Sequence, residues 1–155
     1  MKEPTVQKSL ELAAETERQG ARFYTKMAKR FADKGDVAAV FEQLAADEEV
    51  HEKKFQSLLA GAPEDPITAH QFDRDQYLRA VAISEFIKAE HFVDVDKVET
   101  VGDALNHAIG MEKSTLVFYY GLADELGGHE ALEAIISEEK SHIVALTKRL
   151  EETTR

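Results

Sequence analysis

Two segments of this 155-residue chain each place a single glutamate inside an apolar stripe with a spacing of seven residues. The two stripes consist of Leu10, Glu17, Tyr24 and Phe31, and of Leu105, Glu112, Tyr119 and Leu126. Seven residues advance an α-helix by almost two turns, so positions seven apart lie within about 20° of one face. Both segments are therefore predicted to be long helices whose glutamate points into the core, with a tyrosine following it along the same face.

Two other segments carry a Glu-x-x-His pair at predicted core positions. Glu48 pairs with His51, and Glu139 pairs with His142. Apolar residues stand seven positions before or after these four residues, at Phe41, Leu44, Phe55, Leu58, Leu132, Ile135 and Leu146. Because residues three apart lie on one helix face, one turn from each other, the glutamate and histidine of each pair can reach a common point.

Apolar periodicity and turn residues predict where the helices begin and end. Four long helices are predicted, over residues 5–32, 36–59, 100–126 and 129–151. Asp36 is the predicted N-cap of the second helix and Thr100 that of the third. Gly127 and Gly128 are predicted to end the third helix, because glycine readily adopts the backbone conformation that terminates helices.

The lengths of the connections predict the topology. The first and last links are very short, so helices one and two should form an antiparallel hairpin, and so should helices three and four. Residues 61–100 form a long connection that is predicted to contain a short amphipathic helix over residues 74–90. This connection can return along the bundle. The sequence therefore predicts one all-α domain over residues 1–155, a four-helix bundle with one crossover.

Six polar side chains are predicted to face the interior of this bundle. They are Glu17, Glu48, His51, Glu112, Glu139 and His142. A buried charge without a partner is costly, and raising the pKa of four acids together would also be costly. Two divalent cations would balance four carboxylates, and neutral imidazoles would complete their coordination. Helical bundles that bind two metals have this pattern: two helices each provide one Glu, and the other two each provide a Glu-x-x-His pair.

Four sequence segments carry a resemblance to known proteins. In ETERQGARFY, DEEVHEKKF, MEKSTLVFYY and SEEKSHIVAL the chain resembles the ferritin-like di-iron carboxylate superfamily, and most closely its rubrerythrin-like and bacterioferritin-like members. The resemblance implies a ferritin-like bundle that holds two Fe ions, and Zn or Mn also fit the same ligands. It implies that Glu48 and Glu139 bridge the two metals.

The resemblance also implies a role for the other inward-facing residues. Glu17 and His51 would complete the coordination of one ion, and Glu112 and His142 that of the other. Tyr24 and Tyr119 would be hydrogen-bonding or redox-active groups beside the metals. Packing in the core is the alternative interpretation for both tyrosines, since they continue the apolar stripes.

The chain departs from the rubrerythrin pattern at two points. Rubrerythrins have a further glutamate three residues after the ligand of the third helix, and Thr115 stands there in this chain. The exchange of ligands that this glutamate makes with a histidine is therefore not expected, and His51 should stay bound. The chain also has no cysteine, so it lacks the cysteine-ligated iron module of rubrerythrins. Electrons are expected from another protein or from Fe(II).

The resemblance implies an oxidoreductase that reduces H2O2 or O2 while Fe(II) is oxidised. One alternative is ferritin-type iron storage, with the six ligands forming a ferroxidase centre. Ferritin and bacterioferritin have a fifth helix, whereas this chain ends soon after the fourth, which counts against a cage. The other alternative is a metal-binding bundle without turnover.

Bulk properties restrict the partners and the location. The formal net charge of −11 argues against nucleic-acid binding, which needs a basic face. No apolar run is long enough to span a membrane, and residues 1–15 lack the apolar stretch of a secretory signal, so a cytoplasmic location is expected. Residues 116–120 are apolar on every side of their helix, so their outer face should be covered, either by the crossover helix or by a second subunit, and a homodimer is predicted. The residues that flank the ligand pairs are expected on solvated faces: Glu49, Glu52, Glu138 and Lys140. An auxiliary metal ligand is the alternative interpretation for Glu138.

Overall fold

The computed structural model describes residues 6–61, 95–127 and 129–153, which form α-helices and one short 3-10 helix, with no strand in these ranges. The elements are α1 (Val6–Arg30), α2 (Gly35–Ala60), η2 (Val95–Lys97), α4 (Val101–Leu126) and α5 (Glu130–Thr153). The four long helices agree with the predicted ones to within two residues at each end. The predicted helix over residues 74–90 lies outside the described residues. None of the described helices is both long enough and apolar enough to cross a membrane.

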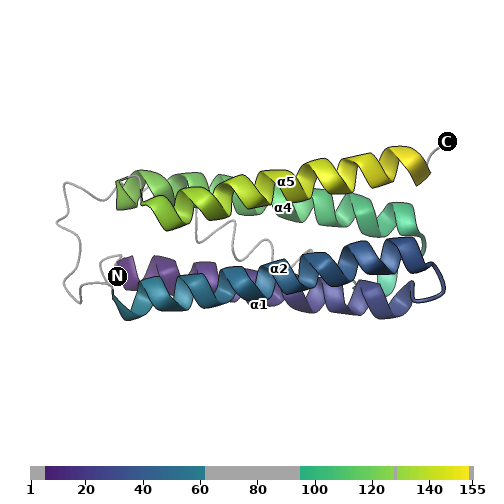
Figure 1. Ribbon diagram of the computed structural model, residues 1–155, viewed down its shortest axis with the longest axis horizontal. Helices are drawn as coiled ribbons and strands as arrows, with labels where there is room; N and C mark the ends of the chain where they lie inside the picture. Colours follow the sequence, from purple (N-terminus) through teal and green to yellow (C-terminus); the bar gives the residue numbers. More distant parts are fainter. Residues whose placement is uncertain (1–5, 62–94, 128, 154–155) are drawn as a thin grey trace.

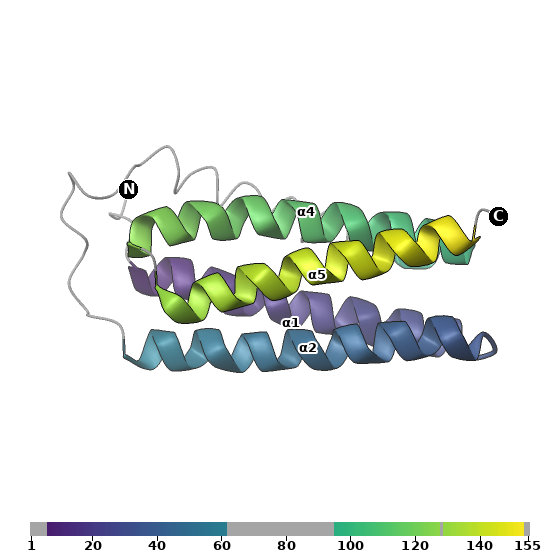
Figure 2. The same ribbon diagram turned by 45° about the horizontal axis from the view of Figure 1, so that its top comes forward.

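The four long helices form two antiparallel hairpins that lie side by side, α1 with α2 and α4 with α5 (Figure 1). In this view α2 and α4 run in the same direction, as the length of the connection between them predicts. Across the bundle, α1 contacts α4 and α2 contacts α5, so the four helices surround one interior (Figure 2). The all-α four-helix bundle predicted from the sequence is confirmed.

Both ends of α4 follow the predicted signals. The side chain of Thr100 accepts a hydrogen bond from the backbone N–H of Asp103 at 3.1 Å, and the Asp103 carboxylate accepts one from the Thr100 N–H at 3.1 Å. This reciprocal capping box satisfies two N–H groups that the helix itself cannot pair. Gly127 ends the helix with φ 64° and ψ 43°, the left-handed conformation in which glycine carries no steric penalty.

The predicted N-cap of α2 is wrong. The cap residue is Lys34, whose carbonyl accepts the first helical hydrogen bond from Ala38 at 2.9 Å and whose side chain makes no capping bond. The N–H of Lys34 in turn donates to Phe31 at 2.8 Å, so the turn after α1 leads directly into α2. This leaves Asp36 inside the first turn, where its negative charge interacts favourably with the positive end of the helix dipole.

Apolar side chains fill the bundle on both sides of its centre. One apolar layer includes Phe23, Met27, Phe31, Phe41, Leu44, Leu105 and Leu146. The other includes Leu10, Phe55, Phe118, Leu122, Leu132 and Ile135. Burial of each such side chain contributes about 1.5–3 kcal/mol. The heptad positions between the two layers hold the polar residues that the sequence singles out.

Candidate metal centre

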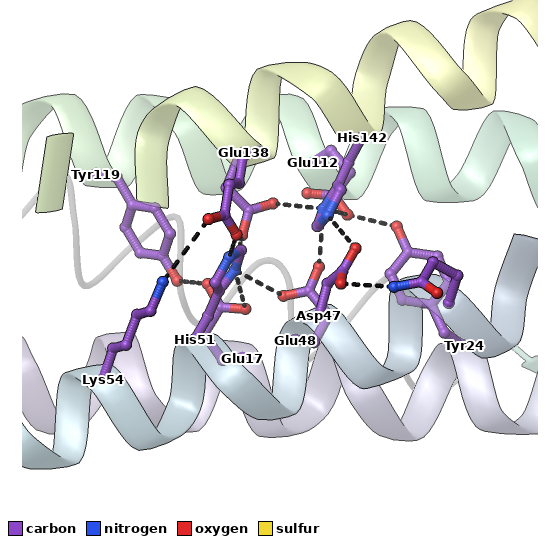
Figure 3. A network of polar contacts seen from close by, with 12 residues as sticks. Glu17, Tyr24, Asp47, Glu48, His51, Lys54, Glu112, Tyr119, Glu138 and His142 are labelled. Carbon is purple, nitrogen blue, oxygen red and sulfur yellow. Dashed lines mark hydrogen bonds and ion pairs between the residues drawn. The ribbon is translucent and has the colours of Figure 1, made fainter. Parts of the chain in front are cut away.

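The structure brings all six predicted ligand residues together in the middle of the bundle (Figure 3). None has more than 5% of its surface exposed: Glu17 1%, Glu48 3%, His51 0%, Glu112 2%, Glu139 0% and His142 5%. Each of the four long helices contributes at least one of them, as the heptad spacing predicts. The predicted convergence of these side chains is therefore present in the fold.

Within this cluster the ligand atoms form two overlapping groups. Glu17, Glu48, His51 and Glu139 offer atoms that all lie within 4.8 Å of one another, and so do Glu48, Glu112, Glu139 and His142. Glu48 and Glu139 belong to both groups. The arrangement provides two adjacent positions that share two carboxylates, each with one further carboxylate and one imidazole of its own.

Both histidines direct the same ring nitrogen toward the shared centre. His51 Nδ1 lies 2.9 Å from Glu139 Oε1, 3.6 Å from Glu17 Oε2 and 3.9 Å from Glu48 Oε2.

The equivalent nitrogen of His142 has equivalent surroundings. It lies 3.2 Å from Glu139 Oε2, 3.4 Å from Glu48 Oε1 and 3.6 Å from Glu112 Oε1. Each Nδ1 atom therefore faces the three carboxylates of its own group, so the two halves of the site are built alike.

The two tyrosines of the apolar stripes hold the glutamates that the groups do not share. Tyr24 Oη donates to Glu112 Oε1 at 2.5 Å, and Tyr119 Oη donates to Glu17 Oε1 at 2.5 Å. Burial raises the pKa of both tyrosines well above 10.0, and the carboxylate that each contacts raises it further. Both tyrosines therefore keep their protons and act as donors to the carboxylates.

The buried carboxylates place several negative charges close together in the interior, and this raises the pKa of neighbouring groups. Burial raises the pKa of Glu112 to about 8, and the charge of Glu139 adds to the rise. Burial alone would lower the pKa of both histidines. Hydrogen bonds to carboxylates outweigh it and raise the pKa of His51 to about 10 and that of His142 to about 11. In the metal-free protein, the imidazoles are therefore the cations that balance the carboxylates.

The donors fit a pair of divalent ions such as Fe(II). Glu17 Oε2 is buried and has no hydrogen-bond partner within the described part of the chain, so this oxygen keeps its lone pairs free for a cation. The set as a whole consists of carboxylate oxygens and imidazole nitrogens, which suit iron, manganese and zinc. Four carboxylates would also match the charge of two divalent ions.

Two acidic residues outside the predicted set of six contact the histidines of the site. Glu138, predicted to lie on a solvated face, has a half-exposed side chain, yet its Oε2 lies 2.5 Å from His51 Nε2. Asp47 Oδ2 lies 3.2 Å from His142 Nε2. The sequence does contain a signal, because an acidic residue directly precedes the shared glutamate in both DEEVH and EEKSH. Glu49 and Lys140 are exposed as predicted.

A solved structure resembles the whole chain in fold. It is the crystal structure of a candidate ferritin-like diiron-carboxylate protein from Thermotoga maritima, which matches with a TM-score of 0.72. The two sequences are 23% identical, and the match covers 99% of each chain. This likeness confirms the predicted ferritin-like fold. No curated protein sequence matches the chain significantly.

A model of the rubrerythrin family matches residues 8–150. This range includes the whole of α2 and α4, nearly all of α1 and α5, and every residue of the two groups that could hold a metal ion. The buried carboxylates and histidines, the ferritin-like fold and the extent of the family match agree with one another. This chain belongs to the rubrerythrin family.

Proposed function

We propose that the chain binds two iron ions and uses them to reduce hydrogen peroxide or oxygen, with oxidation of Fe(II). The observation that carries this proposal is the pair of overlapping, buried groups of ligand atoms. In each group three carboxylates surround an inward-facing imidazole nitrogen. The match to the rubrerythrin family over residues 8–150 supports iron as the metal.

The proposed ligand roles follow from which residues the two groups share. Glu48 and Glu139 stand in both groups and would bridge the metals. Glu17 and His51 would complete the coordination of one ion, and Glu112 and His142 would complete that of the other. Zn(II) and Mn(II) fit the same donors and can stand in for iron in binding experiments.

When bound, a pair of Fe(II) ions supplies the two electrons that reduce hydrogen peroxide to two molecules of water, with uptake of two protons. The chain's own residues prepare the site for this reaction. Tyr24 and Tyr119 orient Glu112 and Glu17 by hydrogen bonds. The apolar layers on either side limit the access of water to the centre and so strengthen the electrostatic interactions within it.

The source of electrons is proposed to lie outside these 155 residues. The 155 residues contain no cysteine, so they cannot hold a thiolate-ligated iron centre. A separate reductase or Fe(II) itself would re-reduce the site. Thr115 is buried at 5% exposure, one turn beyond Glu112, and offers no carboxylate there. His51 is therefore proposed to remain a ligand in both oxidation states.

A homodimer remains a prediction of the sequence, and one feature of α4 supports it. Val117 and Tyr120 are 50% and 46% exposed on the described surface, although both are large apolar side chains. Exposed apolar groups of this kind are typical of protein contacts. Size-exclusion chromatography with light scattering would separate a dimer from a monomer and from a ferritin-type cage.

The proposed function is tested by adding Fe(II) to the metal-free protein under nitrogen and then adding peroxide or O2. Wild-type protein should bind two irons per chain and develop a charge-transfer absorption band on oxidation. Glu48→Ala should remove both properties, because Glu48 belongs to both groups. Glu49→Ala, which changes the exposed neighbour on the same helix, is the matched control and should behave as wild type. Normal iron oxidation by Glu48→Ala would disprove the ligand assignment.

A further inference from the structure

Each histidine of the site has a second carboxylate partner on its outward-facing nitrogen. His51 lies on α2, and its Nε2 contacts Glu138 of α5 at 2.5 Å. His142 lies on α5, and its Nε2 contacts Asp47 of α2 at 3.2 Å. The two contacts therefore cross between the same two helices in opposite directions, as the close view of the site shows (Figure 3).

The two outer carboxylates occupy equivalent positions in the repeated pattern. Asp47 directly precedes Glu48, and Glu138 directly precedes Glu139. The shared glutamate of each helix faces the centre, so the residue before it is turned by about 100° toward the neighbouring helix. This register places each acid against the histidine of the opposite helix.

In the metal-free protein both nitrogens of each ring contact carboxylates, so the outer contacts determine which proton stays on the ring when a metal binds. An ionised carboxylate can only accept hydrogen bonds, so each Nε2 must carry the proton and donate it. A neutral imidazole has only one N–H, which leaves the lone pair on Nδ1. In both rings Nδ1 is the atom that faces the three inner carboxylates.

Further polar side chains hold the outer carboxylates in place. Gln43 donates from Nε2 to Asp47 Oδ1 at 2.9 Å, from one turn earlier on α2. Lys54 Nζ lies 3.7 Å from Glu138 Oε1. Each outer carboxylate thus has one oxygen on the histidine and the other on a residue nearer the surface, so its orientation is fixed from both sides.

We propose that Asp47 and Glu138 are positioning residues, each of which holds one histidine with Nδ1 directed at one metal. This inference rests on the proposed function. Asp47 would support the metal position formed by His142 and Glu112. Glu138 would support the metal position formed by His51 and Glu17. Outer carboxylates of this kind fix the tautomer of a ligand histidine, and their loss typically weakens metal binding about 10–100-fold.

The test is calorimetric titration of the metal-free protein with Co(II) or Zn(II), comparing wild type with Asp47→Asn and Glu138→Gln. Both substitutions keep the size of the side chain and remove only its charge and its strict acceptor character. Each variant should still bind two ions per chain. One equivalent should weaken about 10–100-fold and the other should change little, because each acid contacts one histidine only. The double variant should weaken both equivalents.

Charge-matched controls separate positioning from the general loss of a negative charge. Glu42→Gln on α2 and Glu133→Gln on α5 remove the same charge from exposed side chains on the same helices. Both should leave the two affinities within about threefold of wild type. If Asp47→Asn and Glu138→Gln change affinity no more than these controls, or weaken both equivalents equally, the inference is overturned. If wild-type protein does not bind two ions, the proposed function fails as well.

A second measurement examines the rings directly. In Zn(II)-loaded wild-type protein, long-range proton–nitrogen correlation spectra report which nitrogen of a histidine carries the proton. His51 and His142 should both be protonated at Nε2 and bound to metal through Nδ1. Metal binding through Nε2 in either ring would overturn the inference for that ring, even if the affinities behaved as expected.

Discussion

Tyr24 of α1 donates a hydrogen bond to Glu112 of α4 at 2.5 Å, across the interior between the two hairpins. The reverse contact also exists, because Tyr119 of α4 donates to Glu17 of α1 at 2.5 Å. Each tyrosine therefore holds a carboxylate from the opposite hairpin. The heptad spacing places a tyrosine seven residues after each glutamate, and each tyrosine bonds the glutamate of the other helix, α1 or α4. Packing of the two hairpins against each other therefore also orients the carboxylates of the site.

Removal of one of these hydroxyl groups should destabilise the metal-free protein. Tyr24→Phe would leave Glu112 Oε1 buried without its donor, at a cost of about 1–3 kcal/mol in the free energy of unfolding. Urea unfolding in the presence of a chelator would measure the loss. Tyr120→Phe is the matched control, because that ring is 46% exposed and should change stability by less than about 0.5 kcal/mol. Equal stability of the two variants would contradict the proposed role of Tyr24.

The stability of the metal-free protein should fall as the pH rises. His51 and His142 have pKa values of about 10 and about 11 in the folded chain, above the value of 6.5 for an exposed imidazole. The pKa of Glu112 is likewise raised from 4.5 to about 8. The folded state therefore binds more protons than the unfolded state, and the resulting stability is lost as each group deprotonates.

This pH dependence can be measured by thermal unfolding between about pH 6 and pH 10. The chelated protein should lose stability over this range. The Zn(II)-loaded protein should lose much less, because the metals replace the protons on the imidazoles. A chelated protein whose stability rises with pH over the same range would show that the histidines are not the balancing cations.

Gly20 gives a test of the space beside Glu48. A Cβ atom at Gly20 would meet the Glu48 side chain at 3.5–3.6 Å, an ordinary contact distance. Gly20→Ala should therefore preserve binding of two metals and stabilise the helix by about 0.5–1 kcal/mol. Gly20→Leu should weaken metal binding, because the longer side chain would displace Glu48.

The control for this substitution is Gly121→Leu on α4. A Cβ atom there has no neighbour within 4 Å, so this variant should keep normal metal affinity. Titration with Co(II) compares the two leucine variants. Equal affinity in both would mean that Glu48 does not need its observed position in order to bind.

The sequence predicted those parts of the structure that depend on helical periodicity. Spacing of three and seven residues identifies which face of a helix a residue occupies, so the sequence alone assigns Glu17, Glu48 and His51 to the core. Thr100 and Gly127 were identifiable because their capping roles depend on residue type and local backbone.

Other features depend on contacts that spacing does not encode. The link to Glu138 arises from how α5 sits against α2, and that register is set by packing between helices. The partnership of Asp47 with His142 has the same origin. Asp36 failed as a predicted cap because the tight turn after α1 places the cap of α2 two residues earlier, at Lys34. The sequence thus predicts which residues of each helix face the core, but it does not predict which side chains of α2 and α5 contact each other.

The central claim is that two metals lie between these six side chains and share two of them. The most direct measurement is anomalous X-ray diffraction from crystals loaded with Fe(II) under nitrogen. The account predicts two iron peaks per chain, one at Glu17 and His51 and the other at Glu112 and His142, with Glu48 and Glu139 in contact with both. A single peak, or peaks bound elsewhere while these side chains contact no metal, would contradict it.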